Sequence, residues 1–240
     1  TKEITLLGQN VNAYKSTSNG KTFRLSDLIN ELNSLKELKR IRYTTSHPKD
    51  VSRDLIETHK YCEKLMPILH LPVQSGSSKI LKLMNRKHDK KYYLETVYKI
   101  LEAKPIMKFS SDFIIGYPGE TENDFNETLD LINEIKFINS YSFIFSHRPG
   151  TPVTIEKETD KSILKKRLQD IQELLKDYQI QHKKLFLGKS VKVLVENKMK
   201  DNNKFFGRDV YSNPVIVESE KNLSGKIVDV KISNFNHNNF

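Results

Sequence analysis

Five short apolar runs, rich in β-branched and aromatic residues, recur along the first part of the chain and alternate with segments of helical period. The runs are Ile4–Leu7, Ile41–Tyr43, Ile68–Val73, Phe109–Ile115 and Tyr141–Phe145. Between them, apolar residues repeat every three or four positions, which is the period of an amphipathic helix. Such alternation predicts parallel strands joined by right-handed helical crossovers. We therefore expect an α/β fold.

Each predicted strand is followed by a polar segment that favours a turn. In chain order these segments contain Gly8-Gln9-Asn10, Thr44-Thr45-Ser46, Gln74-Ser75-Gly76-Ser77, Gly116-Tyr117-Pro118-Gly119-Glu120 and Ser146-His147-Arg148. Because the carboxyl ends of parallel strands meet at one edge of a sheet, we expect these turns to surround a single binding site. Backbone requirements alone explain one or two such turns, but they explain five with varied polar chemistry poorly.

The predicted site carries hydroxyl, amide, guanidinium and carboxylate groups without a familiar catalytic motif. The sequence has no G-x-x-x-x-G-K-S/T, G-x-G-x-x-G or G-x-S-x-G pattern, and no histidines pair at metal-binding spacing. Arg148 suits a carboxylate or phosphate, and Glu120 suits an amine. The residues thus predict a pocket for a ligand with hydroxyls, an amino group and a carboxylate, and they do not by themselves define a reaction.

The pattern changes in the second half of the chain. Thr121 followed by acidic residues predicts the start of one helix, and apolar residues at helical spacing predict a long amphipathic helix from about Asp160 that stops near Gly188. Beyond Gly188 the apolar period is two, around Val191–Val195, Val215–Val217 and Val228–Ile232. Short alternating strands predict a small β-barrel of the kind that often holds nucleic acid. We expect one domain over residues 1–187 and a second over 188–240.

The net charge and the cysteine content limit the kinds of partner and metal site that are possible. The formal net charge of +10 favours nucleic acid through counterion release, although solvated lysines in a lysine-rich protein explain part of that excess. No apolar run approaches the roughly 20 residues of a membrane helix, so we expect a cytoplasmic protein with no membrane partner. The single cysteine, Cys62, excludes an internal disulfide and a cysteine-only metal cage, and a packed, inert thiol is expected.

Six segments resemble the radical-SAM methylthiotransferases, in order and at matching spacing. They are ITLLGQNVNAY (4–14), RIRYTTSHP (40–48), HLPVQSGSS (70–78), LMNRKH (83–88), SSDFIIGYPGETENDF (110–125) and SFIFSHRPGTP (142–152). The residues of these segments are most similar to those of the bacterial branch that makes 2-methylthio-N6-isopentenyladenosine in tRNA. The part from about Gly188 resembles the TRAM domain, an RNA-binding β-module. The family usually has Pro where His147 stands, which we expect to alter only the rigidity of that turn.

The resemblance implies a fold, cofactors and partners. It implies a partial (β/α) barrel without its first strand, with S-adenosylmethionine as cofactor. The two [4Fe–4S] clusters of the family would take their cysteines from upstream of Thr1, because thiolates hold such clusters and Cys62 matches none of them. The implied reaction uses one S-adenosylmethionine for methylation and a second to generate a radical at C2 of the adenine. The implied partners are tRNA and an electron-donor protein, and the chain is expected to be an internal fragment, monomeric and inactive alone.

The resemblance also implies roles for individual residues. Those assigned to S-adenosylmethionine are Gly8, Gln9, Asn10, Ser46, Gln74, Ser75, Ser77, Gly116, Glu120 and Arg148. The first three would hold the methionine amino group, the residues of 74–77 the ribose, and those of 116–120 the adenine, while Arg148 would face the cofactor or the substrate base. Those assigned to RNA phosphates are Lys189, Lys192, Lys198, Lys200, Lys204 and Arg208. A solvated β-surface explains this basic set about equally well.

Three other interpretations stay open. Within the family, the substrate could instead be threonylcarbamoyladenosine or a ribosomal protein. Outside it, the chain could be a non-catalytic RNA-binding module, or an unrelated barrel enzyme that binds phosphate at the same edge of the sheet. Two observations distinguish these cases. One is the nucleoside that accumulates without its modification when the gene is deleted, and the other is whether the chain binds S-adenosylmethionine or a sugar phosphate.

Overall fold

The computed structural model describes residues 1–147, 159–200, 203–236 and 239–240. Its first part is built on parallel strands, as expected from the apolar runs. They are β1 (Glu3–Leu6), β4 (Arg40–Tyr43), β5 (Ile68–His70), β6 (Lys108–Ser110), β7 (Asp112–Ile115) and β8 (Tyr141–Ile144). β6 and β7 together occupy the fourth predicted run, because Ser111 interrupts the strand between them.

The parallel strands follow one another in chain order. β1 pairs with β4, β5 with β6, and β7 with β8, all in parallel. The backbone of Ile41 bonds Lys64 (N to O, 2.7 Å) and Met66 (O to N, 3.0 Å), which connects β4 to the chain just before β5. Gln74 bridges to Phe113 and so connects the chain after β5 to β7. These connections confirm the predicted parallel α/β arrangement.

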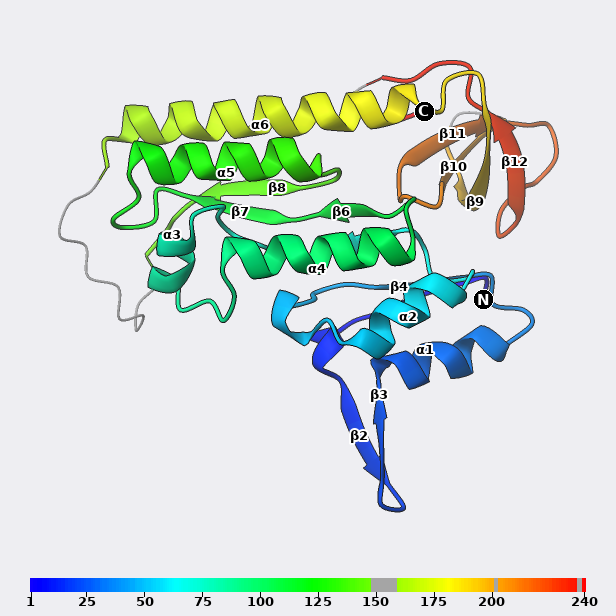
Figure 1. The fold of residues 1–240 in the computed structure, drawn as a ribbon. Helices are drawn as coiled ribbons and strands as arrows, with labels where there is room; N and C mark the ends of the chain where they lie inside the picture. Colours follow the sequence, from blue (N-terminus) through cyan, green and yellow to red (C-terminus); the bar gives the residue numbers. More distant parts are fainter. Residues whose placement is uncertain (148–158, 201–202, 237–238) are drawn as a thin grey trace.

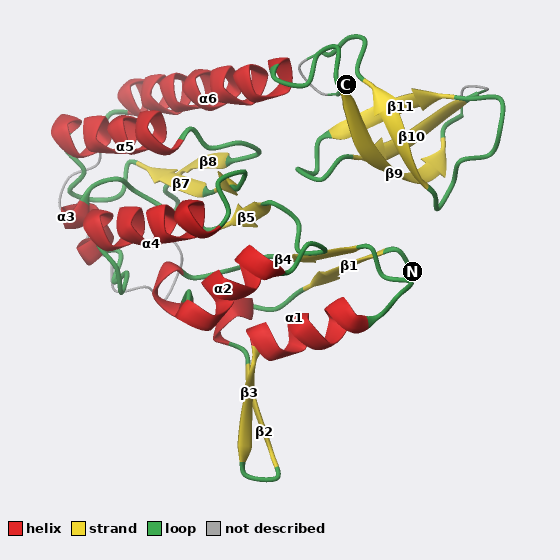
Figure 2. Ribbon diagram, turned by 45° about the vertical axis from the view of Figure 1, so that its right-hand side comes forward, coloured by secondary structure: helices red, strands yellow, loops and turns green. Residues whose placement is uncertain are grey.

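Helices cover one face of these strands, except the last helix, which packs along the final strand β8 (Figures 1 and 2). They are α1 (Leu25–Ser34), α2 (Arg53–Tyr61), α3 (Ser78–Leu83), α4 (Lys90–Ala103), α5 (Glu122–Ile135) and α6 (Lys161–Lys184). The apolar side of the strands, including Ile41, Leu69 and Phe113, is fully buried in the core with residues of these helices. Thr121 caps α5 in a capping box with Asp124, so the predicted helix start is confirmed.

A hairpin that the apolar pattern does not predict projects from this body (Figure 1). β2 (Lys15–Ser18) and β3 (Lys21–Arg24) pair antiparallel across Asn19 and Gly20. Both turn residues have positive φ, 50° and 72°, as a two-residue type I′ turn requires. Two short 3₁₀ turns, η1 (Val11–Ala13) and η2 (Pro48–Asp50), follow β1 and β4.

The last part of the chain forms a separate antiparallel sheet with its own core. Its strands are β9 (Ser190–Lys198), β10 (Lys204–Arg208), β11 (Pro214–Glu218) and β12 (Ile227–Lys231), in the order β11-β10-β9-β12. Val193, Val195 and Phe205 are buried at its centre. A small β-barrel was expected, and the four described strands form one antiparallel sheet in which the edge strands β11 and β12 are not paired with each other.

Two arginines of β4 connect this sheet to the parallel strands. Arg40 donates to the carbonyl oxygens of Arg208 (2.9 Å) and Lys192 (2.8 Å), and only 2% of Arg40 is exposed. Arg42 donates to the carbonyl oxygens of Asp209 and Val210, each at 3.1 Å. Hydrogen bonds to charged donors are the stronger kind, so these contacts fix the two parts against each other.

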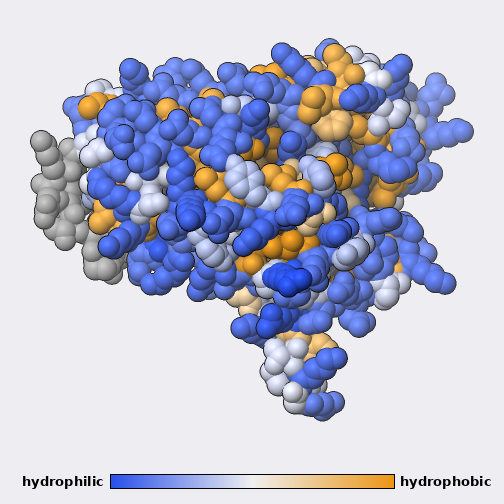
Figure 3. Space-filling model, in the orientation of Figure 1, coloured by the Kyte–Doolittle hydropathy of each residue, from blue (hydrophilic) through white to orange (hydrophobic). Residues whose placement is uncertain are grey.

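Two smaller expectations also have outcomes. Cys62 follows α2 and is buried as a free thiol, as expected. Among the described residues, no helix combines the length and apolar character needed to cross a membrane. On the face shown in Figure 3, hydrophilic residues cover most of the surface.

Candidate functional site

The turns after β1 and β4 are bonded to each other and hold two polar atoms without partners. Asn12 exchanges two hydrogen bonds of 2.8 Å with the backbone of His47. Beside them, Oδ1 of Asn10 and Oγ of Ser46 are buried with no hydrogen-bond partner in the described part of the chain. A buried polar group without a partner costs about 1–3 kcal/mol. Such atoms are therefore candidate contacts for a bound ligand.

The neighbouring predicted residues differ in exposure. Gly8 and Gln9 follow β1 and are exposed, whereas Asn10 is half-buried and its Nδ2 donates to Asp50 at 2.7 Å. The structure thus places Asn10 and Ser46 on two adjacent turns, with one atom of each available.

The turn after β5 is bonded to β7 through Gln74. Gln74 has φ of +78°, a left-handed conformation that is uncommon for a residue with a side chain. Its N–H donates to Asp112 O at 3.0 Å, and its carbonyl accepts from Ile114 N at 2.9 Å. Strained residues held in this way concentrate at functional sites, so Gln74 stays a candidate.

Ser75 and Ser77 are buried against α5. Ser75 Oγ lies 3.3 Å from Thr128 Oγ1, and Ser77 Oγ donates to Asp124 at 2.7 Å. A Cβ on Gly76 would lie 2.3 Å from the carbonyl oxygen of Glu127, so this turn approaches α5 as closely as a backbone can. These two hydroxyls support the turn, and their predicted contact with a ribose stays a prediction.

The turn after β7 is held by a buried carboxylate. Glu120 accepts from the N–H of Gly116 at 2.8 Å and from Arg167 of α6 at 3.0 Å. Burial raises the pKa of Glu120, and the bonds from Gly116 and Arg167 oppose that rise. Arg167 also donates to Glu122 at 2.7 Å and stacks over Phe125.

Arg167 was not among the predicted residues. It lies on the buried face of α6, four residues before Ile171. A charged residue at an apolar position of a helix was the available signal, because arginine is seldom buried without a partner.

We call the carboxyl ends of the parallel strands, together with the turns that follow them, the turn edge. There, two histidines that were not assigned a role connect the turn after β4 to the chain after α3. The rings of His47 and His88 meet edge to face, with centroids 5.4 Å apart. Burial lowers the pKa of both, that of His88 to about 4. On β5, His70 bonds Ser110 at 2.8 Å and lies 3.5 Å from the carboxylate of Asp112. The uncharged His47 and His88 suit hydrogen bonding better than ion pairing at neutral pH.

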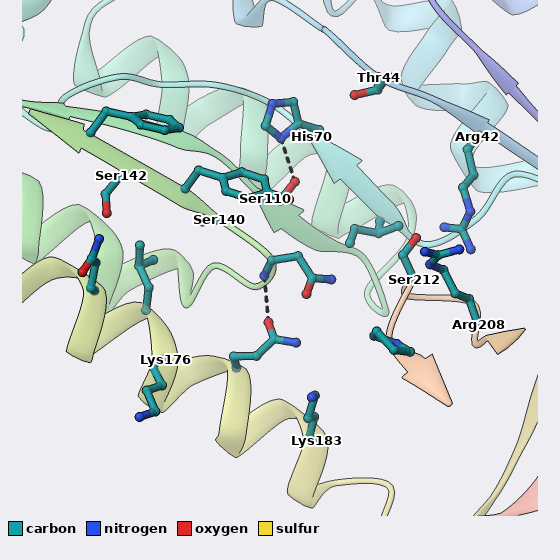
Figure 4. A pocket seen from close by; sticks show the side chains of 18 of the residues that line it. Arg42, Thr44, His70, Ser110, Ser140, Ser142, Lys176, Lys183, Arg208 and Ser212 are labelled. Carbon is teal, nitrogen blue, oxygen red and sulfur yellow. Dashed lines mark hydrogen bonds between the residues drawn. The ribbon is translucent and has the colours of Figure 1, made fainter. Parts of the chain in front are cut away.

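A large cavity lies on the other face of the parallel strands, bounded on one side by α6 (Figure 4). Its volume is about 1160 Å³. Residues of β4, β5, β6 and β8 line it, among them Arg42, His70, Ser110 and Ser142. Arg208 of the second sheet also lines it, whereas the nine described residues assigned to S-adenosylmethionine are not among its lining residues. Arg148, the tenth, lies outside the described residues.

The basic residues assigned to RNA differ in whether they form ion pairs. Lys192 pairs with Asp229 at 3.2 Å, and Arg208 with Glu196 at 2.5 Å. Lys189, Lys198 and Lys200 are exposed, and Lys204 is half-buried on β10 and has a partner of its own. An ion pair leaves less charge for a phosphate, so the exposed three are the stronger candidates.

The described ranges contain no group of three or more His, Cys, Asp or Glu residues that could hold a metal ion. Cys62 is buried behind α2. An iron–sulfur cluster takes thiolate ligands, so the residues described here do not fit one.

Comparison with known proteins identifies the relatives of this chain. The sequence pattern of the Radical SAM superfamily matches residues 1–132. A tRNA-2-methylthio-N(6)-dimethylallyladenosine synthase of Pelagibacter ubique is 54% identical over 237 residues, 99% of this chain and 53% of that protein. The protein of the same name from Bartonella tribocorum is 46% identical over 241 residues, 100% of this chain and 52% of that protein. The chain therefore spans about half the length of the curated relatives it matches.

A solved structure adds information on the fold alone. Coproporphyrinogen III oxidase (HemN) from Escherichia coli, described as a radical SAM enzyme, superposes with a TM-score of 0.52 at 14% identity. The match covers 79% of this chain and 49% of that one.

Proposed function

This chain belongs to the radical SAM superfamily, and from that membership we propose that the protein containing it transfers a methylthio group to C2 of N6-isopentenyladenosine in tRNA. The proposal follows the name of relatives that are 54% and 46% identical over nearly the whole chain. The same proposal places that nucleoside next to the anticodon. The net charge of +10 agrees with an RNA substrate.

One structural observation supports a ligand site at the turn edge. Asn10 Oδ1 and Ser46 Oγ are buried and without partners on two turns that are bonded to each other. An amide oxygen accepts from an amino group, and a serine hydroxyl both donates and accepts. These atoms fit S-adenosylmethionine, which has an amino group, a carboxylate and ribose hydroxyls.

The residues of this chain would then bind and orient the cofactor. Gly8, Gln9 and Asn10 would hold its methionine end, and the left-handed Gln74 would present the turn that receives its ribose. Gly116 and Glu120 would stand near its adenine. S-adenosylmethionine would supply radical chemistry that side chains do not provide. Thiolates hold iron–sulfur clusters and the sequence has a single cysteine, so the cluster ligands would come from elsewhere in the protein.

We also propose the finer architecture that the resemblance implies. Residues 1–187 would be a radical SAM barrel without its first strand, and residues 188–240 a TRAM domain that binds RNA. The four-stranded sheet and the exposed Lys189, Lys198 and Lys200 support the second assignment. An electron-donor protein, a monomeric state and a cytoplasmic location belong to the same proposal.

The experiment uses the full-length protein. A bacterial strain without its own tRNA methylthiotransferase receives the complete gene, and its tRNA nucleosides are analysed by mass spectrometry. The expected product is 2-methylthio-N6-isopentenyladenosine. Appearance of 2-methylthio-threonylcarbamoyladenosine, or of a methylthiolated ribosomal protein, would favour the alternatives within the family. No modified product at all would favour a non-catalytic RNA-binding protein.

A variant pair tests the cofactor site separately. Ser46→Ala removes a hydroxyl that has no partner in the described structure, so the free energy of unfolding should not fall. The affinity for S-adenosylmethionine, measured by calorimetry, should fall several-fold. Ser26→Ala is the matched control, because Ser26 is also buried but bonds Asp54. The control should lose stability and keep cofactor affinity, and the reverse pattern would contradict the site.

A further inference from the structure

A basic cavity lies between α3 and α4 and shares a histidine with the turn edge. Its volume is about 510 Å³. Its charged and polar lining residues are Ser78, Lys82, Arg86, Lys87, His88 and Asp89. Five of these lie within the LMNRKH segment (83–88) or next to it, and the function proposed above gives that segment no role. His88 connects the cavity to the turn after β4 through its ring contact with His47.

The positive charges of this cavity are mostly uncommitted. Asp89, the one carboxylate of the lining, caps α4 by accepting from Tyr92 N at 2.8 Å. Lys87 donates to Asn85 at 2.9 Å. Within the described ranges, the side chains of Arg86 and Lys82 have no hydrogen-bond acceptor or ion-pair partner. Two cationic groups therefore line the cavity without a bonded anion in the described part of the chain.

The surroundings of these cations favour an anionic ligand. Arg86 is half-buried, and burial lowers its pKa, with Asp112 opposing that change. A guanidinium that has lost part of its hydration without gaining an acceptor is costly, and a bound anion would offset that cost.

His88 adds a neutral donor to the same place. It is 7% exposed, and neither ring nitrogen has a hydrogen-bond partner among the described residues. The backbone of Val73 acts to raise the pKa of His88, but it forms no hydrogen bond with either ring nitrogen. Because burial lowers the pKa of His88 to about 4, the ring carries one N–H at neutral pH and no charge.

We propose that this cavity binds one phosphate group of the tRNA backbone, beside the nucleotide presented to the turn edge. The inference rests on the proposed function, because it takes RNA as the substrate. A phosphate matches the planar fork of Arg86 and the point charge of Lys82. Phosphate contacts fix the register of a nucleic acid without reading its sequence, so the site would position the strand relative to the cofactor.

Binding measurements with the full-length protein test the site. The probe is an anticodon stem-loop RNA that carries isopentenyladenosine, and its Kd is measured by fluorescence anisotropy over a series of salt concentrations. Arg86→Gln should raise the Kd about ten-fold, as expected for a lost hydrogen-bonded ion pair. It should also reduce the slope of log affinity against log salt by about 0.7 to 0.9, the value for one phosphate. Arg86→Lys should keep the slope and lose part of the affinity.

Two further variants make the outcome decisive. Lys82→Gln is an exposed substitution, so it tests the cavity even where Arg86→Gln destabilises the fold. Lys99→Gln on α4 is the control, because it removes the same charge from an exposed position outside the cavity. Wild-type affinity and slope in both cavity variants would overturn the proposal, and so would an equal loss in Lys99→Gln. The proposed function is decided apart from this, by the nucleoside that the wild-type protein modifies.

Discussion

Glu120 and Arg167 form a buried ion pair, 3.0 Å from Oε2 to Nη1, that joins the turn after β7 to α6. Their side chains are 2% and 7% exposed. Because Glu120 also accepts from Gly116 N, the pair fixes the backbone of a turn assigned to the cofactor. Glu120 therefore holds this turn in place, and its predicted position near an adenine stays a prediction.

Removing the positive partner should destabilise the protein strongly. Arg167→Met leaves the carboxylate of Glu120 buried without its guanidinium, and breaking a buried pair in this way costs about 3–5 kcal/mol. Urea unfolding followed by circular dichroism measures the change in the free energy of unfolding.

The double variant Glu120→Gln with Arg167→Met is the control for this prediction. It removes the buried charge together with its partner, so it should recover part of the lost stability. A single variant no less stable than the double variant would show that the pair contributes little, and that the packing of Arg167 over Phe125 matters more.

The sequence predicts the parallel strands and the α5 start because local chemistry decides them. Apolar runs such as Ile41–Tyr43 are buried on the helix side of the sheet, and that burial produces the pattern. Thr121 and Asp124 form the expected capping box from four adjacent residues. The long α6 and the change of period near Gly188 follow from the same rules.

Pairings between distant residues could not be read from the sequence. The bond from Arg167 to Glu120 spans 47 positions, and that from Arg40 to Arg208 spans 168. The β2–β3 hairpin lacks an apolar face, and only Asn19-Gly20 marks its turn. The large cavity was missed for a related reason, because polar residues inside strands, such as His70, face it.

Asp124 should make the stability depend on acidic pH. Burial alone would raise its pKa, but hydrogen bonds from Lys79, Ser77 and Thr121 outweigh burial and lower the pKa below the ordinary 3.8. The ionised carboxylate thus contributes stability above pH 3.8, and this contribution is lost as the pH falls toward the folded-state pKa. Asp124→Asn should cost about 2–3 kcal/mol at pH 7.

The difference in the free energy of unfolding between wild type and Asp124→Asn should become smaller in acid. Unfolding in urea, repeated from pH 7 down to pH 3, measures the difference. Asp27→Asn is the matched control, because Asp27 also accepts at a helix start but is less buried than Asp124. A constant difference across the pH range would show that the carboxylate charge is not the source of the stability.

Gly76 should tolerate no side chain. A Cβ at this position would lie 2.3 Å from Glu127 O and 2.6 Å from Thr128 Cα, which are backbone atoms of α5. Gly76→Ala must therefore separate the turn from the helix, at about 1–3 kcal/mol. Gly8→Ala is the control, because its nearest neighbour is one methyl group of Val11 at 3.2 Å. Thermal unfolding measures the Tm of both variants, and an equal fall in Tm for the two would contradict the close approach.

Arg40 should couple the unfolding of the second sheet to that of the parallel strands. Its guanidinium bonds the carbonyl oxygens of Arg208 and Lys192, and it lies 3.6 Å from the carboxylate of Glu3. Arg40→Met keeps the buried volume and leaves these acceptors without a donor, at about 1–3 kcal/mol for each buried group.

The expected result of Arg40→Met is two separate transitions in calorimetry where the wild type has one, with faster proteolysis between α6 and β9. Arg53→Gln is the control, since Arg53 is exposed and pairs only within α2. The second sheet has a hydrophobic core of its own around Val193 and Phe205, so it should remain folded after uncoupling. A single transition at a lower Tm would instead mean that the two cores depend on each other through more than these arginine contacts.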